Sequence, residues 1–306
     1  MSVRELVVLG TSSQVPTRHR NHNGYLLRWD GRGILFDPGE GTQREMIRAG
    51  VAATDITRIL ISHFHGDHCL GLAGIVQRIS LDRVPHEVDV HFPASGRVYY
   101  DRLRHASHFR DHARVRPREI AADGPIHTDA DLTIEARRLD HSVECYGFRV
   151  QEPDRRRFLP ERLDALGIRG PDVGRLQREG RITVGGREIA LEDVSAVRRG
   201  QAMAFVMDTR PCPAALELAR GVDLLVCEST YLVSEEREAW ERGHMTARQA
   251  AELARDAGVR RLVLTHFSQR HADERVFLEE ARPVHADAVA ARSGLRVPLP
   301  PRPAVG

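Results

Sequence analysis

The chain has 306 residues, of which 41% are hydrophobic and 29% charged, a composition that excludes disordered and collagen-like proteins and allows a sizeable core. No segment approaches the roughly 18 consecutive apolar residues of a membrane span, and Met1–Ser13 lacks a secretory leader pattern, so we expect a cytoplasmic protein with no membrane partner. The net charge of +2 does not by itself indicate a polyanionic partner. All 45 basic residues are Arg, so phosphate contacts need guanidinium groups, backbone amides or His.

The first part of the chain alternates short apolar runs with helical patterns. Strands are predicted at Glu5–Leu9, Tyr25–Trp29, Ile34–Phe36 and Arg58–Ser62, and helices at Gly41–Ala49 and Leu70–Ser80. Asp30-Gly31 between two of these strands is typical of a hairpin turn. The alternation resumes later, at Phe205–Met207, Leu216–Arg220, Leu224–Val226, Thr246–Ala257 and Leu262–Leu264. Strands that alternate with helices predict an α/β layered architecture.

Two segments depart from this pattern. From about Glu152 to Ala196 the chain is polar and rich in Gly and Arg, and we interpret it as an inserted excursion without a core of its own. The tail Val297–Gly306 contains four prolines and is expected to be a surface appendage. The four cysteines are scattered singly, which argues against a disulfide framework or a thiolate zinc site.

The strongest chemical signal is the segment His63-Phe64-His65-Gly66-Asp67-His68, directly after a predicted buried strand. Three imidazoles and a carboxylate within six residues supply more ligands than one metal ion can comfortably use. His63 and His65, two apart in an extended segment, point the same way, whereas Asp67 and His68 follow the turn. The segment therefore predicts a metal site, with two ions favoured over one.

Two ions need further ligands, and the sequence offers them where apolar runs end. His141, Asp208 and His266 each follow such a run, and α/β sheets place their sites at strand ends. With Asp208 bridging and a shared hydroxide, seven ligands would serve two ions. Nitrogen and oxygen donors favour Zn²⁺, with Mn²⁺ as the alternative. The other histidines, such as His91, His127 and His271, are assigned no ligand role.

These residues resemble a known family. His-x-His-x-Asp-His after a buried strand is the signature of the metallo-β-lactamase superfamily, whose fold is an αββα sandwich, and more specific segments resemble ribonuclease Z, the tRNA 3′-processing endonuclease. They are Phe36–Gln43, with Pro38 where that family has Cys; Pro16–Asn21, with Arg18 in place of Lys; Cys227-Glu228-Ser229-Thr230, with Cys227 in place of His; and His244-Met245-Thr246.

The resemblance implies a function and a division of roles. It implies a zinc-dependent endoribonuclease that removes the 3′ trailer of precursor tRNA, leaving a 3′-hydroxyl on the tRNA and a 5′-phosphate on the trailer. His63, His65 and His141 would hold one Zn²⁺, Asp67, His68 and His266 the other, and Asp208 would bridge them. Asp67 would also orient or deprotonate the attacking water. His244 would be the general acid, held by Glu228.

The resemblance also assigns the substrate contacts. It implies one metallo-β-lactamase-like domain over residues 1–306, in which residues 152–196 form a flexible tRNA-binding arm. Substrate contacts are expected at Arg18, Arg20, Asn21, Gly170, Pro171, Arg175 and Arg178. A homodimer is implied, with no organic cofactor.

Two other functions remain open on the sequence alone. One is a different hydrolase of the same fold, such as an arylsulfatase or a cyclic-nucleotide phosphodiesterase, which would share all seven ligands. The other is a non-catalytic RNA-binding or scaffold protein. An arm for a large substrate argues against the first, and the intact ligand set argues against the second.

Overall fold

The computed structural model describes residues 3–302, which divide into two compact units. The larger unit contains residues 3–150 and 202–300, and the smaller one contains residues 151–201 with 301–302. Within the described part of the chain, no helix is long and apolar enough to cross a membrane.

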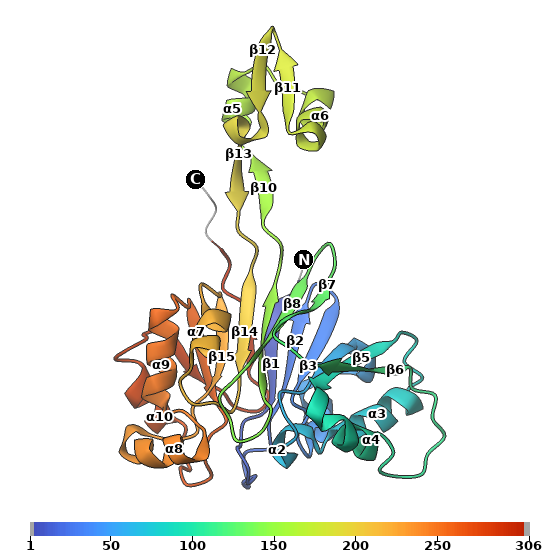
Figure 1. Ribbon diagram of the computed structural model, residues 1–306, viewed down its shortest axis with the longest axis vertical. Helices are drawn as coiled ribbons and strands as arrows, with labels where there is room; N and C mark the ends of the chain where they lie inside the picture. Colours follow the sequence, from blue (N-terminus) through green and yellow to red (C-terminus); the bar gives the residue numbers. More distant parts are fainter. Residues whose placement is uncertain (1–2, 303–306) are drawn as a thin grey trace. The chain divides into compact units, whose positions relative to one another are not determined.

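The larger unit is built on two seven-stranded sheets that face each other (Figure 1). The first sheet has the order β18-β1-β2-β3-β4-β5-β6, and its strands are β1 (Arg4–Gly10), β2 (Gly24–Trp29), β3 (Arg32–Phe36), β4 (Ile56–Leu60), β5 (Val88–Pro93), β6 (Val115–Ile120) and β18 (Arg296–Pro298). The second has the order β17-β16-β15-β14-β9-β8-β7, and its strands are β7 (Gly124–Thr128), β8 (Thr133–Arg138), β9 (Tyr146–Gln151), β14 (Ala202–Val206), β15 (Leu224–Glu228), β16 (Arg261–Thr265) and β17 (Ala288–Ala290).

Helices cover the outer face of each sheet. On the first sheet they are α1 (Thr42–Ala49), α3 (Leu72–Leu81) and α4 (Arg97–Arg104), and on the second they are α7 (Pro213–Ala219), α9 (Ala247–Asp256) and α10 (Arg275–Ala281). The short helices α2 (Gly66–Cys69) and α8 (Glu236–Arg242) lie in loops beyond the strand ends. The order helix, sheet, sheet, helix confirms the predicted αββα sandwich.

Three apolar clusters hold these layers together. The central one joins the two sheets: the Phe205 ring lies 4.6 Å from Phe36 and 5.3 Å from Tyr25, centroid to centroid. These three rings are fully buried, and burial of such a side chain contributes about 2–3 kcal/mol. The sheets are thereby fixed face to face, which fixes the loops at their strand ends.

The smaller unit corrects one expectation from the sequence. It contains β10 (Arg155–Phe158), α5 (Pro160–Ala165), α6 (Pro171–Glu179), β11 (Arg181–Val184), β12 (Arg187–Ala190) and β13 (Ser195–Arg198). β10 pairs with β13 and β11 with β12, both antiparallel. Ile168, Leu176, Ile182, Ile189 and Val194 form a buried apolar cluster between these elements. The prediction of an excursion without a core was therefore wrong, because isolated apolar residues far apart in the chain converge.

The tail corrects a second expectation. β18 pairs antiparallel with β1, and Val297 and Leu299 are buried. Residues 296–299 thus complete the first sheet and are not a surface appendage. Residues 303–306 of the predicted appendage lie outside the described residues.

Candidate metal centre

The predicted ligands lie in loops that follow strands of both sheets. His63, His65, Asp67 and His68 follow β4, Asp208 follows β14, and His266 follows β16. β14, β15 and β16 are parallel neighbours, so their carboxyl ends meet at one edge of the second sheet. His141 follows β8 at the same edge, where its ring lies 5.0 Å from that of His63.

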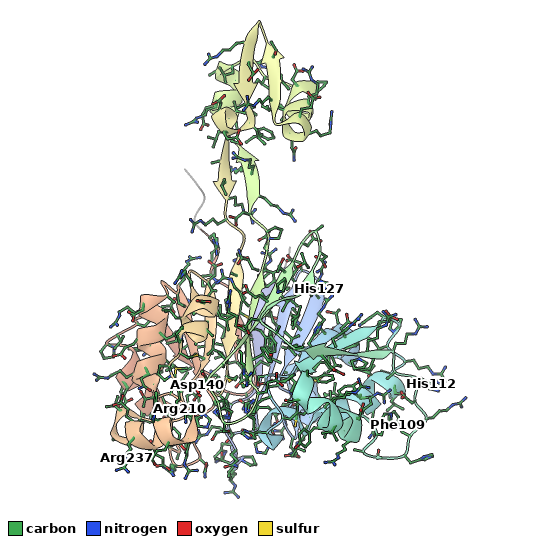
Figure 2. The ribbon with its side chains drawn as sticks, viewed as in Figure 1. Phe109, His112, His127, Asp140, Arg210 and Arg237 are labelled. Atoms are coloured by element: carbon green, nitrogen blue, oxygen red, sulfur yellow. The ribbon has the colours of Figure 1, made fainter. Side chains whose placement is uncertain are left out.

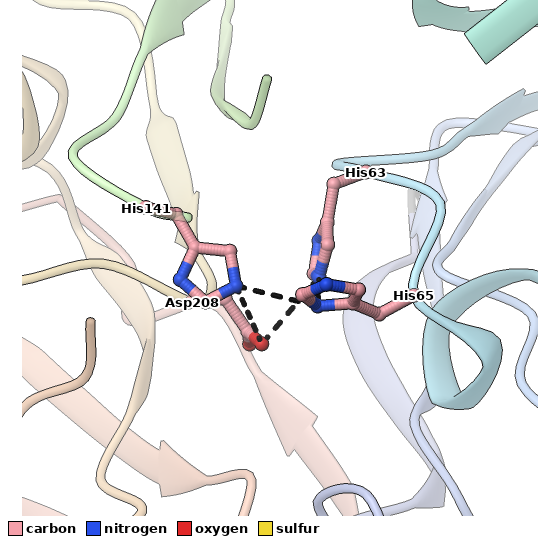
Figure 3. Close-up of side chains that lie close together, drawn as sticks. All are labelled: His63, His65, His141 and Asp208. Atoms are coloured by element: carbon pink, nitrogen blue, oxygen red, sulfur yellow. Dashed lines mark hydrogen bonds and ion pairs between the residues drawn. The ribbon is translucent and has the colours of Figure 1, made fainter. Parts of the chain in front are cut away.

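One group of donors consists of His63, His65, His141 and Asp208 (Figure 3). Nδ1 of His65 lies 2.9 Å from Nε2 of His63 and 3.3 Å from Nε2 of His141. Oδ2 of Asp208 lies 3.5 Å from Nε2 of His63 and 3.8 Å from Nε2 of His141. Four donor atoms thus face a common point.

A second group consists of Asp67, His68 and His266, and Asp208 reaches it as well. Nε2 of His68 lies 3.2 Å from Nε2 of His266 and 3.2 Å from Oδ2 of Asp67. Oδ1 of Asp208 lies 3.4 Å from Nε2 of His68 and 3.2 Å from Nε2 of His266. The two carboxylate oxygens of Asp208 therefore face different donor groups, which is the arrangement of a bridging ligand.

Hydrogen bonds orient the histidines of the first loop. Asp37, directly after β3, accepts bonds from the backbone amide and the hydroxyl of Ser62, each 2.7 Å long. Nδ1 of His68 donates to Oδ2 of Asp37 (2.8 Å), and Nδ1 of His63 donates to the Ser62 hydroxyl (3.0 Å). Both rings thereby carry their proton on Nδ1 and keep a bare Nε2 for a ligand.

The histidines of the other loops are oriented in the same way. Nδ1 of His141 donates to the carbonyl of Gly243 (3.0 Å). Nδ1 of His266 donates to the Thr230 hydroxyl (2.7 Å), which in turn donates to Oε2 of Glu228 (2.6 Å). The sequence predicted a role for Glu228, as the partner of His244, but none for Asp37, Thr230 or the Gly243 carbonyl, although Asp37 and Thr230 lie within the motifs that resemble ribonuclease Z.

The contacts among the donor atoms themselves indicate that a cation belongs at this place. Ring nitrogens of the two groups face each other over 2.9–3.3 Å, and their lone pairs repel each other unless a proton or a cation lies between them. Oδ1 of Asp208 is buried and accepts no hydrogen bond. A cation removes both penalties, because it accepts the lone pairs and neutralises the carboxylate.

The protonation equilibria show the same demand for positive charge. Burial would raise the pKa of Asp208, but the His266 and His68 rings outweigh it and hold that pKa well below its usual range. Burial would lower the pKa of His68, but the Asp208 and Asp67 carboxylates raise it well above its usual range. A proton on Nε2 of His68 would therefore compensate the buried carboxylates where no cation does so.

His244 lies beside both donor groups. Its ring centre is 5.3 Å from that of His141 and 5.4 Å from that of His266. Nδ1 of His244 donates to Oε1 of Glu228 over 3.0 Å, and Glu228 is fully buried at the end of β15. Burial lowers the pKa of His244, but the Glu228 carboxylate, followed by that of Asp208, raises it to about 9. The ring is thus protonated near neutral pH.

A pocket of about 300 Å³ opens over this centre. His65, Asp67, His141, Asp208, His244 and His266 line it together with polar side chains such as Gln14, Arg242, Gln269 and Arg270. A polar pocket that contains donors, a carboxylate and a protonated imidazole suits a charged ester better than an apolar molecule.

The structure places the three predicted residues of the Arg18–Asn21 loop differently. Arg18 is exposed. Nδ2 of Asn21 donates to the carbonyl of Glu40 over 2.8 Å. The Arg20 guanidinium is only 4% exposed and donates to the carbonyls of Ser268 and His271. Arg20 therefore holds the loop after β16 in place, and its guanidinium is committed to the protein.

The predicted arm residues lie in the smaller unit. Gly170 has a φ of 55° and immediately precedes Pro171, the first residue of α6. Arg175 and Arg178 are exposed on α6, where Arg175 pairs with Asp172 (3.3 Å). The smaller unit thus presents exposed Arg side chains, and their role in substrate binding stays a prediction.

Comparison with known proteins places this fold in a class. Residues 17–171 match the model of the metallo-β-lactamase superfamily, and residues 190–267 match a β-lactamase superfamily domain. Among solved structures, the short form of human tRNase Z superposes with a TM-score of 0.70 at 24% identity, covering 97% of this chain and 99% of that one. A long-form yeast RNase Z gives a TM-score of 0.68 at 18% identity over 97% of this chain.

Sequence comparison narrows the class. A curated Ribonuclease Z from Streptomyces coelicolor is 61% identical over 304 residues, covering 99% of this chain and all of that one. The Ribonuclease Z of Chlamydia trachomatis is 46% identical over 303 residues, again covering 99% of this chain and all of the relative. The chain therefore belongs to the ribonuclease Z family of metallo-β-lactamase-fold hydrolases.

Proposed function

We propose that this chain is a zinc-dependent endoribonuclease that removes the 3′ trailer from precursor tRNA, leaving a 3′-hydroxyl on the tRNA and a 5′-phosphate on the trailer. Full-length identity of 61% to a curated Ribonuclease Z carries the proposal for the substrate. The shared carboxylate of Asp208 between two donor groups supports phosphodiester hydrolysis as the chemistry.

The donor set suits two Zn²⁺ ions, with Mn²⁺ as the alternative. His63, His65 and His141 would hold one ion, Asp67, His68 and His266 the other, and Asp208 would bridge them. When bound, such a pair lowers the pKa of water and neutralises charge on phosphoryl oxygens. Five imidazole nitrogens against two carboxylates, most of them buried, favour zinc over magnesium or calcium.

The side chains around the pocket supply the proton transfers. Asp67 lines the pocket and would accept a hydrogen bond from the attacking water, which orients it toward phosphorus. The departing 3′ oxygen needs a proton. Nδ1 of His244 is held by Glu228, so Nε2 of His244 is the atom left to donate it. The raised pKa of His244 keeps that proton in place before the reaction.

A side-by-side assay tests the substrate. Purified protein loaded with zinc should cut trailer-bearing precursor tRNA at the 3′ end of the tRNA and should be slow on aryl sulfates and cyclic nucleotides. Metal analysis of the same preparation should give two equivalents per chain. Preferential hydrolysis of a small ester, or protein that holds no metal, would contradict the proposal.

We also propose that the smaller unit is a tRNA-binding arm that contacts the body of the substrate. Its exposed arginines on α6, including Arg175 and Arg178, would contact phosphates, and Gly170-Pro171 would shape the turn before that helix. Arg18 and Asn21 would contact the RNA near the pocket.

Removal of the arm tests this role. The backbone amide of Glu152 donates to the carbonyl of Gln201 over 2.9 Å, so a Gly-Ser turn in place of Asp154–Arg199 closes the chain at an existing contact. The shortened protein should lose tRNA cleavage but retain hydrolysis of bis(p-nitrophenyl) phosphate. Equal loss of both activities would show that the arm only supports folding.

We propose a homodimer as the assembly, as expected for this family. Light scattering coupled to gel filtration should give twice the mass of the chain, which is 34.3 kDa. A monomer that cuts precursor tRNA at the full rate would contradict this part of the proposal.

A further inference from the structure

The two tryptophans of the chain lie in opposite environments. Trp29 is 2% exposed in the central core, whereas Trp240 on α8 is 58% exposed. Trp240 lies one helical turn, about 5 Å, before Gly243, whose carbonyl holds the ring of His141. Trp240 does not itself line the pocket, but Glu241 and Arg242, the next two residues, do, so a large aromatic surface is exposed next to the pocket lining.

Arg210 fixes this ring to the loops that carry predicted ligands. Its guanidinium carbon lies 5.2 Å from the centre of the Trp240 ring, and its Nε donates to the Trp240 carbonyl over 2.7 Å. The same guanidinium pairs with Asp140 over 3.1 Å, and Figure 2 shows Asp140 and Arg210 side by side. Asp140 precedes His141, and Arg210 follows Asp208 by two residues. The ring thus has a defined position relative to the centre.

The charges around the ring are balanced. On α8, Arg242 pairs with Glu238 (3.0 Å) and Arg237 pairs with Glu241 (2.9 Å). Glu238 also pairs with Arg270 over 2.6 Å. With these ion pairs formed, α8 is a poor site for attracting phosphates. What it offers a ligand at this place is the flat apolar face of Trp240.

We propose that Trp240 is a stacking residue for an unpaired nucleobase next to the scissile phosphodiester. This inference rests on the proposed function. An RNA strand that enters a pocket of about 300 Å³ must do so unpaired, so the bases on either side of the cut phosphate need new stacking partners. Every base has a π-face, so an exposed Trp can accept any of them, and Arg210 contributes a cation beside the stack.

Kinetics on precursor tRNA test the stacking. Trp240→Ala should raise KM by about tenfold, because stacking of a base on an aromatic side chain contributes about that factor to affinity. Trp240→Phe should restore most of the lost affinity. Arg237→Ala is the matched control on the same helix, since its side chain is 92% exposed and Figure 2 shows it away from Asp140 and Arg210. The control should retain the KM of the original protein.

Abasic substrates locate the stacked base. Removing one base at a time around the cleavage site should produce, at one position, a tenfold rise in KM for the original protein and no rise for Trp240→Ala. This loss of additivity identifies a direct contact. If Trp240→Ala acted only by disturbing the structure, it would raise the KM of every abasic substrate by the same factor. That result would overturn the proposal.

Fluorescence gives a readout that does not depend on turnover. Because Trp29 is buried, precursor tRNA should quench the emission of Trp240 in a slow His244→Ala background and should leave the emission of a His244→Ala/Trp240→Phe protein unchanged. No quenching, an unchanged KM, or a changed oligomeric state in Trp240→Ala would overturn the stacking role, the last because it would make Trp240 a contact between copies. Failure of the original protein to cut precursor tRNA would instead defeat the proposed function.

Discussion

At the scale of single residues, the centre depends on backbone conformations that most side chains avoid. Asp37, Asp208 and His266 all have positive φ angles, of 42°, 39° and 60°. Such conformations cost of order 1–3 kcal/mol each and persist where the surroundings enforce them. All three lie within two residues of the end of a strand of the sandwich, so the sheets hold them in the positions that aim their side chains at the donor groups.

Replacement of His244 should affect the rate of hydrolysis without affecting metal binding. His244→Ala should lower the turnover of precursor tRNA by about 10²-fold or more, because the leaving oxygen loses its proton donor. Metal content, measured by mass spectrometry of the purified protein, should stay unchanged. His271→Ala serves as the control, since His271 pairs with Glu235 (2.9 Å). Full activity in His244→Ala would remove His244 from the mechanism.

Asp37 should tune the metal affinity without being a ligand. Asp37→Asn weakens the acceptor that orients His68, so metal affinity should fall by about 10- to 100-fold, as measured by competition with a chelator. Asp30→Asn is the matched control, because Asp30 also has a positive φ (50°) but lies at the hairpin turn. Equal affinities for both variants would contradict an orienting role for Asp37.

His91, which is not one of the predicted metal ligands, should make the stability of the protein depend on pH. Burial lowers the pKa of His91 to about 4, and its Nε2 has no hydrogen-bond partner. As pH falls below about 6.5, His91 takes up a proton in the unfolded chain but stays neutral in the folded protein. The folded protein therefore loses stability between pH 6.5 and pH 4. Relative to the original protein, His91→Gln should therefore gain about 2 kcal/mol on going from pH 7.5 to pH 5.

Urea unfolding of both proteins at the two pH values measures this gain. The metal centre also titrates in acid, but it is the same in both proteins and cancels in the difference. A difference in stability between the two proteins that does not change with pH would show that His91 is not the group responsible.

At the scale of elements, the predicted ligands lie in the loops that follow strands, and the first turns of the helices fix where these loops end. Asp208 follows β14, Glu228 is the last residue of β15, and His266 follows β16. Because these strands are parallel neighbours, they place the two carboxylates and the imidazole at one edge of the sheet. Their apolar runs are what made these strands predictable. Asp208 and His266, which follow two of these runs, were the candidate ligands, whereas Glu228 was predicted to hold His244.

The start of α9 offers a test at this scale. The Thr246 side chain accepts from the amide of Gln249 (3.2 Å), and the Gln249 side chain accepts from the amide of Thr246 (3.0 Å). Thr246→Ala should lower the free energy of unfolding by about 1 kcal/mol, because it leaves the backbone amide of Gln249 without a partner. Thr246→Ser should retain most of the stability in the same urea titration. An Ala variant as stable as the Ser variant would contradict the capping role.

At the scale of the whole molecule, the metal centre joins the two sheets. Its donors come from the loop after β4 in the first sheet and from loops after β8, β14 and β16 in the second. A metal that binds only the folded chain stabilises it by about 2.7 kcal/mol at a hundredfold excess over Kd.

Chelation should therefore lower the melting temperature of the protein by several degrees and abolish cleavage of precursor tRNA, and added Zn²⁺ should restore both. Asp208→Ala, which lacks the shared carboxylate, serves as the control and should show little response to the chelator. A melting temperature that is unchanged by chelation in the original protein would contradict a bound metal pair.

Some of this protein could be determined from the sequence alone. Apolar runs located seven strands of the two large sheets to within about three residues, because burial on both faces of a sheet requires continuous apolar stretches. The more polar strands β5 to β9 and the short strands β17 and β18 were not predicted. The density of donors in His63–His68 predicted a metal site, since such a cluster has few structural uses. Asp30-Gly31 predicted a turn, and both residues have positive φ.

Only the tertiary structure decided the rest, because it depends on which distant segments meet. The apolar residues of the smaller unit and of β18 are too sparse to signal burial along the chain, yet they are buried by partners remote in sequence. The orienting roles of Asp37, Ser62, Thr230 and the Gly243 carbonyl arise from hydrogen bonds between loops, which no spacing encodes. Likewise, Trp240 became a candidate binding surface only when folding left its ring exposed beside Arg210, next to the pocket lining.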